Sequence, residues 1–452
     1  MRYFSPVAFV LFTLAAVSLG ARPRVIIETD AGGDPDDEQS LVRLLVCAND
    51  FDIEGIIANR PAARDGENLN TERTGIGIVR RMVKAYGECW PWLVQHDANY
   101  PAPDALLART VQGTNDRDEG VRLVIDAVDR ADPRPVWFLN WGTDSESAAS
   151  NLKRALDLVL KERGPEGYAS FKRKVRLSSA DKFGEHTTSI APPFPIWVDT
   201  FRPEMDGKRW YWQFSAFTAK AGGIDLERHV RAGHGPLGAL YPTNTHPRQK
   251  EGDTGTFLYL LPVGLGDPDQ PTWGSWAGRY APNPAFAGMP YFHATGADTW
   301  KGTTHRDNSQ ARFAEDIQND FRMRMDWCVQ PWSGANHPPK VAGPDIGGQP
   351  VVKSGDTVRL NASDTSDPDG DELTFRWWQY VECGTPRVTP ELRGADTPVA
   401  SFVAPKTAES ITLHFVVTVS DNRSPAATRY GRVVVHIAPA VDSPAVEALK
   451  CP

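Results

Sequence analysis

The chain has 452 residues, 40% of them hydrophobic and 23% charged, so it can form two or three domains with packed cores and is neither disordered nor fibrous. Its 49 Lys and Arg against 57 Asp and Glu give a net charge of −8, and no run of five basic residues occurs. Because phosphate binding needs concentrated positive charge, these numbers argue against nucleic acid or an anionic membrane surface as the main partner.

The first twenty residues have the pattern of an export signal. Arg2 supplies a positive charge, Phe4 to Val17 is almost wholly apolar, and Ser18-Leu19-Gly20 offers the small residues that a signal peptidase requires. The apolar run is short for a membrane span, which makes a retained anchor the weaker alternative. We therefore expect residues 1–20 to be a cleaved signal peptide and the mature protein to be secreted or periplasmic.

Five cysteines remain after this segment, and none forms a Cys-x-x-Cys pair, so a zinc ribbon is disfavoured. An exported protein is free to form disulfides, and Cys47 with Cys89 or Cys383 with Cys451 are two candidate pairs. An odd number of cysteines leaves at least one thiol free.

Residues 21–333 alternate between strand and helix patterns. Short β-branched or apolar runs predict strands at 24–27, 51–58, 135–139, 174–177 and 196–198. Apolar residues at helical spacing predict helices at 38–48, 74–86, 120–131, 144–163 and 310–325. This alternation predicts an α/β fold with a mainly parallel sheet flanked by helices. Between residues 192 and 300 Gly, Pro and Trp are dense and helical periodicity fades, which is typical of long functional loops.

A linker is expected at 334–340, and residues 341–452 then read as a small all-β sandwich. Alternating strands separated by turn residues are predicted at 357–361, 373–380, 399–403, 411–420 and 430–437. The segment from Asn361 to Asp371 resembles the strand-and-turn signature of exported immunoglobulin-like domains of the PKD or cadherin-like kind. Its acids Asp367, Asp369 and Asp371 either hold calcium or serve as turn residues, and turn chemistry has the larger share.

The most informative segment is the loop Glu28-Thr29-Asp30-Ala31-Gly32-Gly33-Asp34-Pro35-Asp36-Asp37-Glu38, which has six acids in eleven residues. It follows a predicted buried strand and opens a predicted helix, and the carboxyl ends of parallel strands form the ligand crevice of such sheets. Like charges are unfavourable there unless a cation neutralises them, and several carboxylates suit calcium. The alternative is a solvated acidic loop that caps the helix, but capping needs only one or two carboxylates.

Asp30-x-Gly32 followed by Asp36-Asp37 resembles the nucleoside hydrolase signature, in which Asp-x-Asp-Pro-Gly-x-Asp-Asp opens the fold. Glu28 stands at the first acid, Ala31 replaces the Pro, and the loop is longer by residues 33–35. This departure and several later segments resemble exported nucleoside-hydrolase-like proteins described as cellulose-binding. Those segments are Gly233-His234-Gly235-Pro236-Leu237-Gly238, Glu251-Gly252-Asp253-Thr254, Gly274-Ser275-Trp276-Ala277-Gly278-Arg279-Tyr280, Arg324-Met325-Asp326-Trp327-Cys328 and Ala335-Asn336-His337-Pro338-Pro339.

The resemblance implies a calcium site and a general base. Asp30 and Asp37 resemble the family's calcium ligands, Asp253 is the best candidate for the later ligand, and Asp36 resembles the base that takes a proton from the attacking water. The family's sugar-binding Asn has no clean match; Asn59 ends the second predicted strand, but Arg60-Pro61 follows it.

Other candidate substrate-binding residues come from Trp-rich and His-rich loops. An aromatic ring can pack on the C–H face of a sugar, although most Trp residues fill cores. Trp141 is the best placed, and Trp273 and Trp276 on a Gly-rich loop come next. The proton donor to the leaving oxygen stays open, and its candidates are Glu251, Asp144, Glu185, His186, His234 and His293. For any one His, a structural role is the more common one.

These observations predict an exported, calcium-dependent hydrolase that cleaves a glycosidic bond in a polysaccharide or oligosaccharide. A non-catalytic carbohydrate-binding protein on the same scaffold is the first alternative, and a true nucleoside hydrolase is the second. The expected partner is a carbohydrate, with no nucleic acid and no membrane after signal cleavage.

Overall fold

The computed structural model describes residues 22–142, 150–180, 193–200, 202–205, 208–210, 223–246, 248–342, 351–385 and 388–440. The expected signal peptide at residues 1–20 lies outside these ranges. None of the helices in the described part of the chain is long and apolar enough to cross a membrane.

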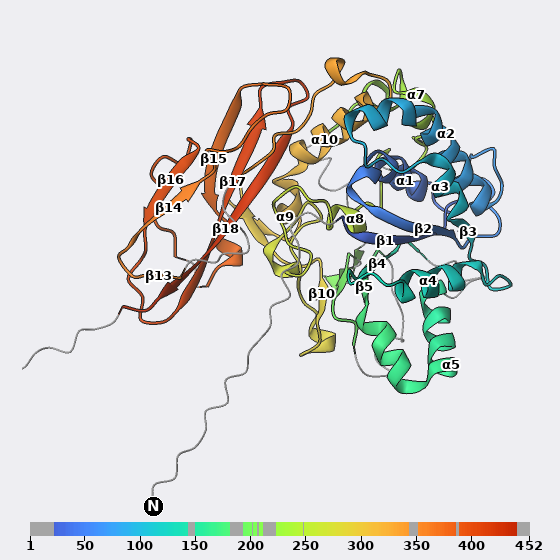
Figure 1. The fold of residues 1–452 in the computed structure, drawn as a ribbon, viewed down its shortest axis with the longest axis horizontal. Coiled ribbons are helices and arrows are strands. Elements are labelled where there is room, and N and C mark those ends of the chain that lie inside the picture. The colour runs from blue at the N-terminus through green and yellow to red at the C-terminus, as the bar shows by residue number, and fades with distance from the viewer. Residues whose placement is uncertain are drawn as a thin grey trace, which may run out of the picture.

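An eight-stranded sheet forms the centre of the first region, in the order β3-β2-β1-β4-β5-β6-β10-β9 (Figure 1). Its parallel strands are β1 Arg24–Thr29, β2 Asp52–Ala58, β3 Thr110–Gln112, β4 Val136–Asn140, β5 Val175–Ser179, β6 Trp197–Asp199 and β10 Tyr291–His293. The edge strand β9, Ala281–Pro282, runs antiparallel to β10. Two short hairpins accompany the sheet: β7 Arg202–Met205 with β8 Lys208–Trp210, and β11 Asp298–Trp300 with β12 Thr303–His305.

Helices cover both faces of this sheet (Figure 1). They are α1 Asp36–Val46, α2 Gly75–His96, α3 Pro103–Ala108, α4 Glu119–Asp129, α5 Asn151–Arg173, α7 Gly235–Ala239, α8 Gly255–Leu258, α9 Asn308–Ala311 and α10 Ala314–Asp326. Successive side chains of β1 point to opposite faces of the sheet and show which helices cover each face. Val25 and Ile27 pack with α1, α2 and α10, whereas Ile26 packs with α4 and α5. The near-continuous apolar strands follow from burial on both faces.

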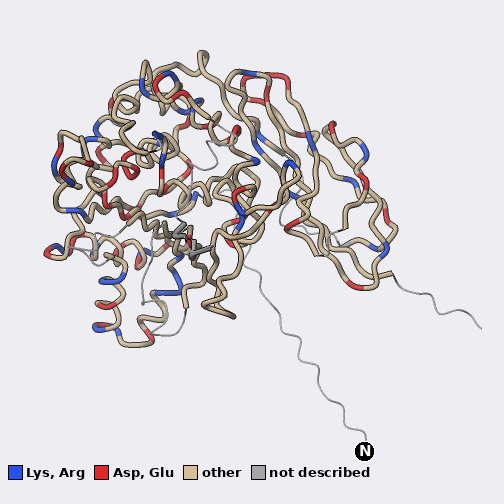
Figure 2. Tube along the Cα trace, turned by 180° about the vertical axis from the view of Figure 1, so that it is seen from behind, with Lys and Arg blue, Asp and Glu red and all other residues tan. Residues whose placement is uncertain are grey.

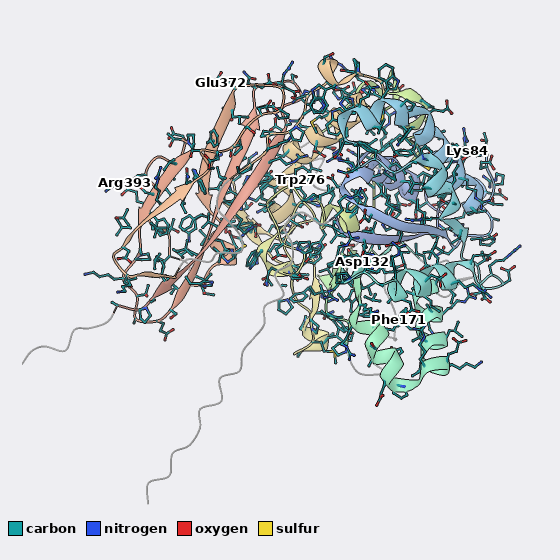
Figure 3. The ribbon with its side chains drawn as sticks, viewed as in Figure 1. Lys84, Asp132, Phe171, Trp276, Glu372 and Arg393 are labelled. Atoms are coloured by element: carbon teal, nitrogen blue, oxygen red, sulfur yellow. The ribbon has the colours of Figure 1, made fainter. Side chains whose placement is uncertain are left out.

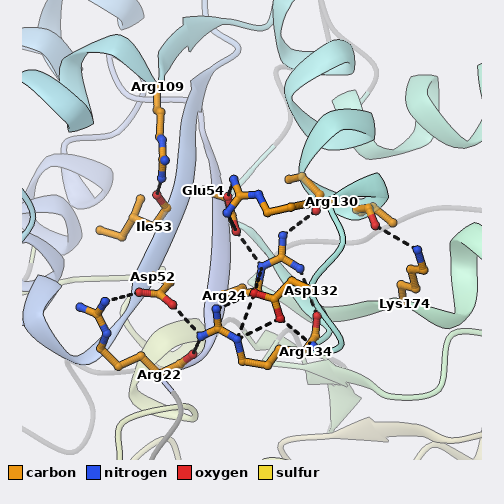
Figure 4. A network of polar contacts seen from close by, with 12 residues as sticks. Arg22, Arg24, Asp52, Ile53, Glu54, Arg109, Arg130, Asp132, Arg134 and Lys174 are labelled. Carbon is orange, nitrogen blue, oxygen red and sulfur yellow. Dashed lines mark hydrogen bonds and ion pairs between the residues drawn. The ribbon is translucent and has the colours of Figure 1, made fainter.

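The amino-terminal edge of the sheet is closed by a network of ion pairs (Figure 4). Arg24, at the start of β1, donates from Nε to Glu54 Oε1 at 2.7 Å and from Nη2 to the Ala127 carbonyl at 2.6 Å. Arg134 reaches Asp52 at 2.6 Å, at the start of β2. Charged side chains at this edge thus satisfy one another, whereas the acids at the opposite edge face one another.

The C-terminal region is all β and lies beside the α/β region (Figure 1). One sheet has the order β13-β18-β17-β15 and a second pairs β14 with β16. The strands are β13 Val351–Lys353, β14 Thr357–Asn361, β15 Leu373–Gln379, β16 Val399–Val403, β17 Ile411–Asp421 and β18 Thr428–Ala438. Apolar side chains of both sheets share one core, which is the packing of a small sandwich.

Turn chemistry accounts for the three acids of the predicted turn in this region. The Asp367 Oδ1 atom accepts the backbone N–H groups of Asp369 and Asp371 at 2.8 and 3.2 Å. Asp369 is bound by His337, and Asp371 is bound by Arg423 at 2.7 Å. Their oxygens lie close enough for a metal ion, and the Asp367 Oδ2 atom is buried without a hydrogen-bond partner among the described residues, so these turn contacts account for most but not all of the cluster.

The fold class is confirmed, and the element bounds differ locally. The helix expected at 74–86 continues to His96 through Pro91, and α5 continues to Arg173 past a kink at Gly164. The expected start of α5 at residue 144 falls outside the described residues. The short elements α3 and β3 were not predicted, since neither has enough residues to show a periodicity.

Four of the cysteines carry free thiols: Cys47, Cys89, Cys328 and Cys383. The candidate pairing of Cys47 with Cys89 is therefore wrong, because Cys89 contacts the thiol of Cys328 instead. Cys451 lies outside the described residues, so its pairing with Cys383 stays a prediction.

Buried polar contacts join the two regions. Asp298 is fully buried and accepts hydrogen bonds from Arg279 at 2.8 Å and from the Tyr380 hydroxyl of the β region at 2.6 Å, with Arg312 at 3.5 Å. Arg432 of β18 donates to the Leu265 carbonyl at 2.7 Å. Such a contact set holds the two regions in one orientation.

Asp298→Ala should remove the shared acceptor and leave two guanidinium groups without their carboxylate. We expect a loss of about 3–5 kcal/mol in the free energy of unfolding, measured by urea denaturation. Asp364→Ala, at an exposed position of the β region, is the matched control and should change stability by less than about 0.5 kcal/mol. Equal effects of the two variants would contradict the structural role of Asp298.

Candidate functional site

The acidic loop connects β1 with α1 at the carboxyl edge of the sheet. Asp36 and Asp37 occupy the first turn of α1, where the helix dipole favours negative charge. Oxygens of Asp36, Asp37 and Asp253 all lie within 4.8 Å of one another. Asp30 approaches the same group and shares a hydrogen bond with Asp37, while the Thr29 hydroxyl donates to Asp37. The structure thus brings all four predicted acids to one place.

A clamp from α1 brings the distant Asp253 to this loop. Gln39 accepts the backbone N–H groups of Lys250 and Glu251 at 2.9 and 3.0 Å and donates to the Pro242 and Arg248 carbonyls at 2.9 and 2.7 Å. One helix side chain therefore fixes the whole segment from 242 to 251 beside the acids.

Glu251 is the second part of this clamp and does not face a ligand. It is fully buried, and its carboxylate pairs with Arg43 of α1 at 2.6 and 3.0 Å. It also accepts hydrogen bonds from Tyr241 at 2.8 Å and from Gln249 and Thr254 at 2.9 Å each. With its oxygens occupied in this way, Glu251 has a structural position rather than the substrate-binding one expected for it.

Gly252 allows the close approach of Asp36 to the same segment. A Cβ atom at position 252 would lie 2.4 Å from the Asp36 Oδ2 atom, closer than any real contact. A side chain at position 252 would therefore displace the Asp36 carboxylate from its present place.

Lys250 places a positive charge at the outer side of the cluster. Its Nζ atom forms ion pairs with Asp34 and, at 3.3 Å, with the Asp36 Oδ2 atom. The lysine is about one third exposed, so it partly neutralises Asp36 from the solvent side. The sequence pattern does not reveal this contact, because Lys250 and Asp36 are brought together only by the fold.

Burial and like charges raise the pKa values of the acids. Burial raises the pKa of Asp36 to about 6; Lys250 opposes the shift, and Asp34 and Asp30 add to it. Burial, with Asp253, Asp30 and Asp36, raises the pKa of Asp37 well above its usual range. Burial also raises the pKa of Glu38 to about 7. Proton or cation binding thus relieves the repulsion within the cluster.

The chemistry of this donor set fits a hard divalent cation. The donors are buried and half-buried carboxylate oxygens with mutual repulsion, and calcium prefers six to eight oxygen ligands. Asp36, Asp37 and Asp253 would hold the ion, with Asp30 beside them. This set differs from the expected one in that Asp36, the expected base, lies among the ligand oxygens.

A buried carboxylate beneath the cluster organises the neighbouring strands. Glu28 accepts hydrogen bonds from Asn59 at 3.1 Å, from Ser150 at 3.0 Å and from the backbone and side chain of Asn151 at 3.0 and 2.8 Å. Asn59 also donates to the Gly142 carbonyl at 2.8 Å, and its Oδ1 atom is buried without a hydrogen-bond partner among the described residues. Asn59 thus lies at the carboxyl edge, next to the loop that holds Asp30.

The remaining expected sugar-binding side chains are placed elsewhere. Trp141 is buried and donates to the Thr256 hydroxyl at 2.7 Å, so it supports the segment after Asp253. His234 pairs with Asp326 of α10 at 3.1 Å. Trp276 is buried where the β region meets the α/β region (Figure 3), with its ring against Tyr430. For Trp276 the expected contact with sugar is therefore not supported.

Among the candidate proton donors, Asp144, Glu185 and His186 lie outside the described residues. His293 pairs with Asn283, and burial lowers its pKa to about 4. Gln39 and Lys250 were missed as site-forming residues, and the sequence carried no signal for either. Glu28 was recognised at the first acid of the motif, but its hydrogen bonds to Asn59, Ser150 and Asn151 were not predicted.

Residues 24–280 match the family described as cellulose-binding Sde182, nucleoside hydrolase-like domain. The chain belongs to this family. Residues 357–437 match a second family, described as the C-terminal domain of cellulose-binding protein Sde0182. The predicted recognition of both regions is thereby confirmed.

A solved structure supports the same relationship. It is a nucleoside hydrolase-related hypothetical protein from Saccharophagus degradans that is associated with carbohydrate metabolism, with 29% sequence identity and a TM-score of 0.70. The match covers 92% of this chain and 100% of that one. A PKD domain from KIAA 1837 protein matches 22% of this chain and 90% of its own at 21% identity, but its TM-score of 0.17 is too low for any argument. A search of curated proteins found no match.

Glu251→Gln should strongly destabilise this Sde182-family protein, because it leaves the buried Arg43 guanidinium without a counter-charge. We expect a loss of about 3–5 kcal/mol in the free energy of unfolding by urea. Glu67→Gln is the matched control: its pair with Arg64 is half exposed and should contribute less than about 1 kcal/mol.

In the presence of a chelator, Asp36→Asn should become more stable relative to the wild type as the pH rises from 3.8 to about 6. The folded wild type holds the Asp36 proton more tightly than the unfolded chain, so raising the pH through this window lowers its stability. Asparagine does not ionise and escapes this loss. Urea denaturation of both proteins across the window measures the difference, and a constant difference would contradict the raised pKa.

Proposed function

We propose that the protein is an exported carbohydrate-active hydrolase that cleaves a glycosidic bond of a polysaccharide or oligosaccharide with the help of calcium. The observation that carries this proposal is the close grouping of Asp36 with the buried Asp37 and Asp253 at the carboxyl edge of the sheet. Family membership and the carbohydrate-associated solved relative support the substrate class.

The residues of this edge have distinct parts in the proposed chemistry. A bound divalent cation would supply charge stabilisation and a lowered water pKa. Asp36 resembles the base that takes a proton from water, and in the metal-free site burial raises its pKa to about 6. Asp37 is oriented by the Thr29 hydroxyl, and Asn59 presents a buried carbonyl oxygen that a sugar hydroxyl can satisfy. The negative edge favours the oxocarbenium-like charge of the transition state.

A non-catalytic carbohydrate-binding role is the second candidate, and Lys250 favours it. The lysine holds Asp36 in an ion pair at 3.3 Å, which reduces the basicity of that carboxylate. In this role the edge would clamp sugar hydroxyl groups and leave the bond intact.

Calcium should stabilise the chelator-treated protein. At a concentration about 100 times its dissociation constant, the gain is about 2.7 kcal/mol, which raises the thermal midpoint by several degrees. Asp37→Asn should abolish most of this shift, whereas Asp65→Asn, at a fully exposed position, should leave it unchanged. Differential scanning calorimetry with calcium, magnesium and chelator measures the effect, and an unshifted wild type would contradict the proposed metal.

Release of soluble sugar from polysaccharides, oligosaccharides and nucleosides tests the activity. The wild type should release sugar in a chelator-sensitive manner, and Asp36→Asn should lower turnover by roughly 100- to 10,000-fold while keeping glycan affinity. Retention on an insoluble glycan without any release would favour the binding role instead.

A further inference from the structure

The thiols of Cys89 and Cys328 meet in the interior of the α/β region. Cys89 lies in α2 and Cys328 lies just after the end of α10, so the two come from opposite ends of this region's sequence. Each is 1% exposed and carries a free thiol. The Cys328 thiol donates a hydrogen bond to the Cys89 sulfur. Two cysteine side chains in such contact need little movement to be joined as a disulfide.

The surrounding chain holds both sulfur atoms in place. The Cys328 Sγ atom also lies 3.8 Å from the Arg324 carbonyl oxygen, and the buried Arg324 side chain pairs with Asp320 at 2.8 Å. On the other side, a Cβ atom at position 235 would lie 3.0 Å from the Cys89 Sγ atom, so Gly235 leaves this sulfur its space against α7. The two sulfurs are therefore positioned next to each other before any bond joins them.

The two thiols of this pair differ in reactivity. The hydrogen bond from Cys328 lowers the pKa of the Cys89 thiol, and the backbone N–H of Leu237 adds to this effect. The same hydrogen bond, together with burial, raises the pKa of the Cys328 thiol well above its usual range. Cys89 is therefore the thiol that ionises first, and the thiolate is the form that attacks a disulfide.

The other two cysteines that the structure describes have different surroundings. Burial raises the pKa of the Cys47 thiol to about 12 and that of the Cys383 thiol to about 11. Cys383 donates a hydrogen bond to the Trp273 carbonyl at 3.1 Å. Thiols that stay protonated in this way react slowly. Cys47, which is 1% exposed like the pair, is therefore the matched control for it.

We propose that Cys89 and Cys328 are a dithiol that is oxidised to a disulfide when the chain folds in an oxidising medium. The oxidant is the disulfide of a small thiol or of a thiol oxidoreductase. The Cys89 thiolate attacks one sulfur of this disulfide and releases its first thiol. Cys328 then attacks the Cys89 sulfur of the mixed disulfide and releases the second thiol. Two electrons pass to the oxidant, and the two cysteine protons end on its two released thiols.

Burial determines when this bond forms. Because both sulfurs are 1% exposed, the oxidant meets them before α2 and α10 have packed over them. Acidic and basic residues are spread over the trace rather than gathered on one face (Figure 2), so access depends on burial and not on the charge of the oxidant. The bond closes a long loop and restricts the unfolded chain. This inference stands on the contact of two sulfurs and is independent of the proposed hydrolase activity.

Refolding of the full-length mature protein in a buffer of reduced and oxidised glutathione tests this proposal. The refolded protein is alkylated without reductant and digested, and its peptides are mapped by mass spectrometry. We expect one pair of peptides that is joined through Cys89 and Cys328 and separates on reduction. If both cysteines are alkylated in the folded, oxidised protein, or if either is joined to another cysteine, the proposal is overturned.

Oxidation should also raise the thermal midpoint by about 5 °C over that of the same protein in reductant, because the closed loop destabilises the unfolded chain. Cys89→Ala and Cys328→Ala should each remove this gain, and the double variant should remove no more than either alone. Cys47→Ala should keep the gain. Each variant is compared with itself in reductant, so that packing defects cancel. A gain that persists in Cys89→Ala or Cys328→Ala would contradict the proposed bond.

Discussion

The buried pair between Arg43 and Glu251 is the constraint on which the site depends. It joins the first helix to a segment about two hundred residues later, and Gln39 fixes the backbone of the same segment. A buried guanidinium left without its carboxylate is strongly destabilising, so separating the two segments would be costly. The clamp therefore sets where Asp253 and Lys250 stand relative to Asp36.

Charged side chains form ion pairs at the amino edge of the sheet, whereas at the carboxyl edge like charges lie close together. At the amino edge Arg24 and Glu54 satisfy each other together with neighbouring groups (Figure 4). At the carboxyl edge Asp36 and Asp37 face other acids, and the cluster is relieved by a proton, a cation or Lys250. Repulsion among these acids destabilises the folded state, and such local destabilisation is typical of functional sites.

The β region packs against the α/β region through buried contacts and is not held by the linker alone. Asp298 with Tyr380 and His337 with Asp369 are polar contacts buried between the two regions. The second contact also holds the His337 ring that stacks on Trp332. These contacts fix the C-terminal sandwich against the region that carries the acid cluster.

The sequence by itself determined the alternation of strands and helices, the all-β region and the acidic loop after the first strand. Each of these is a local pattern, since side-chain periodicity and adjacent acids are visible within a dozen residues. Only the tertiary structure decided that Glu251 and Trp276 are buried, that Lys250 meets Asp36, and that Trp332 is exposed. Glutamate and tryptophan suit a ligand as well as a core, and their neighbours come from distant segments. Burial and pairing are properties of the packed chain, so residue type and spacing could not assign them.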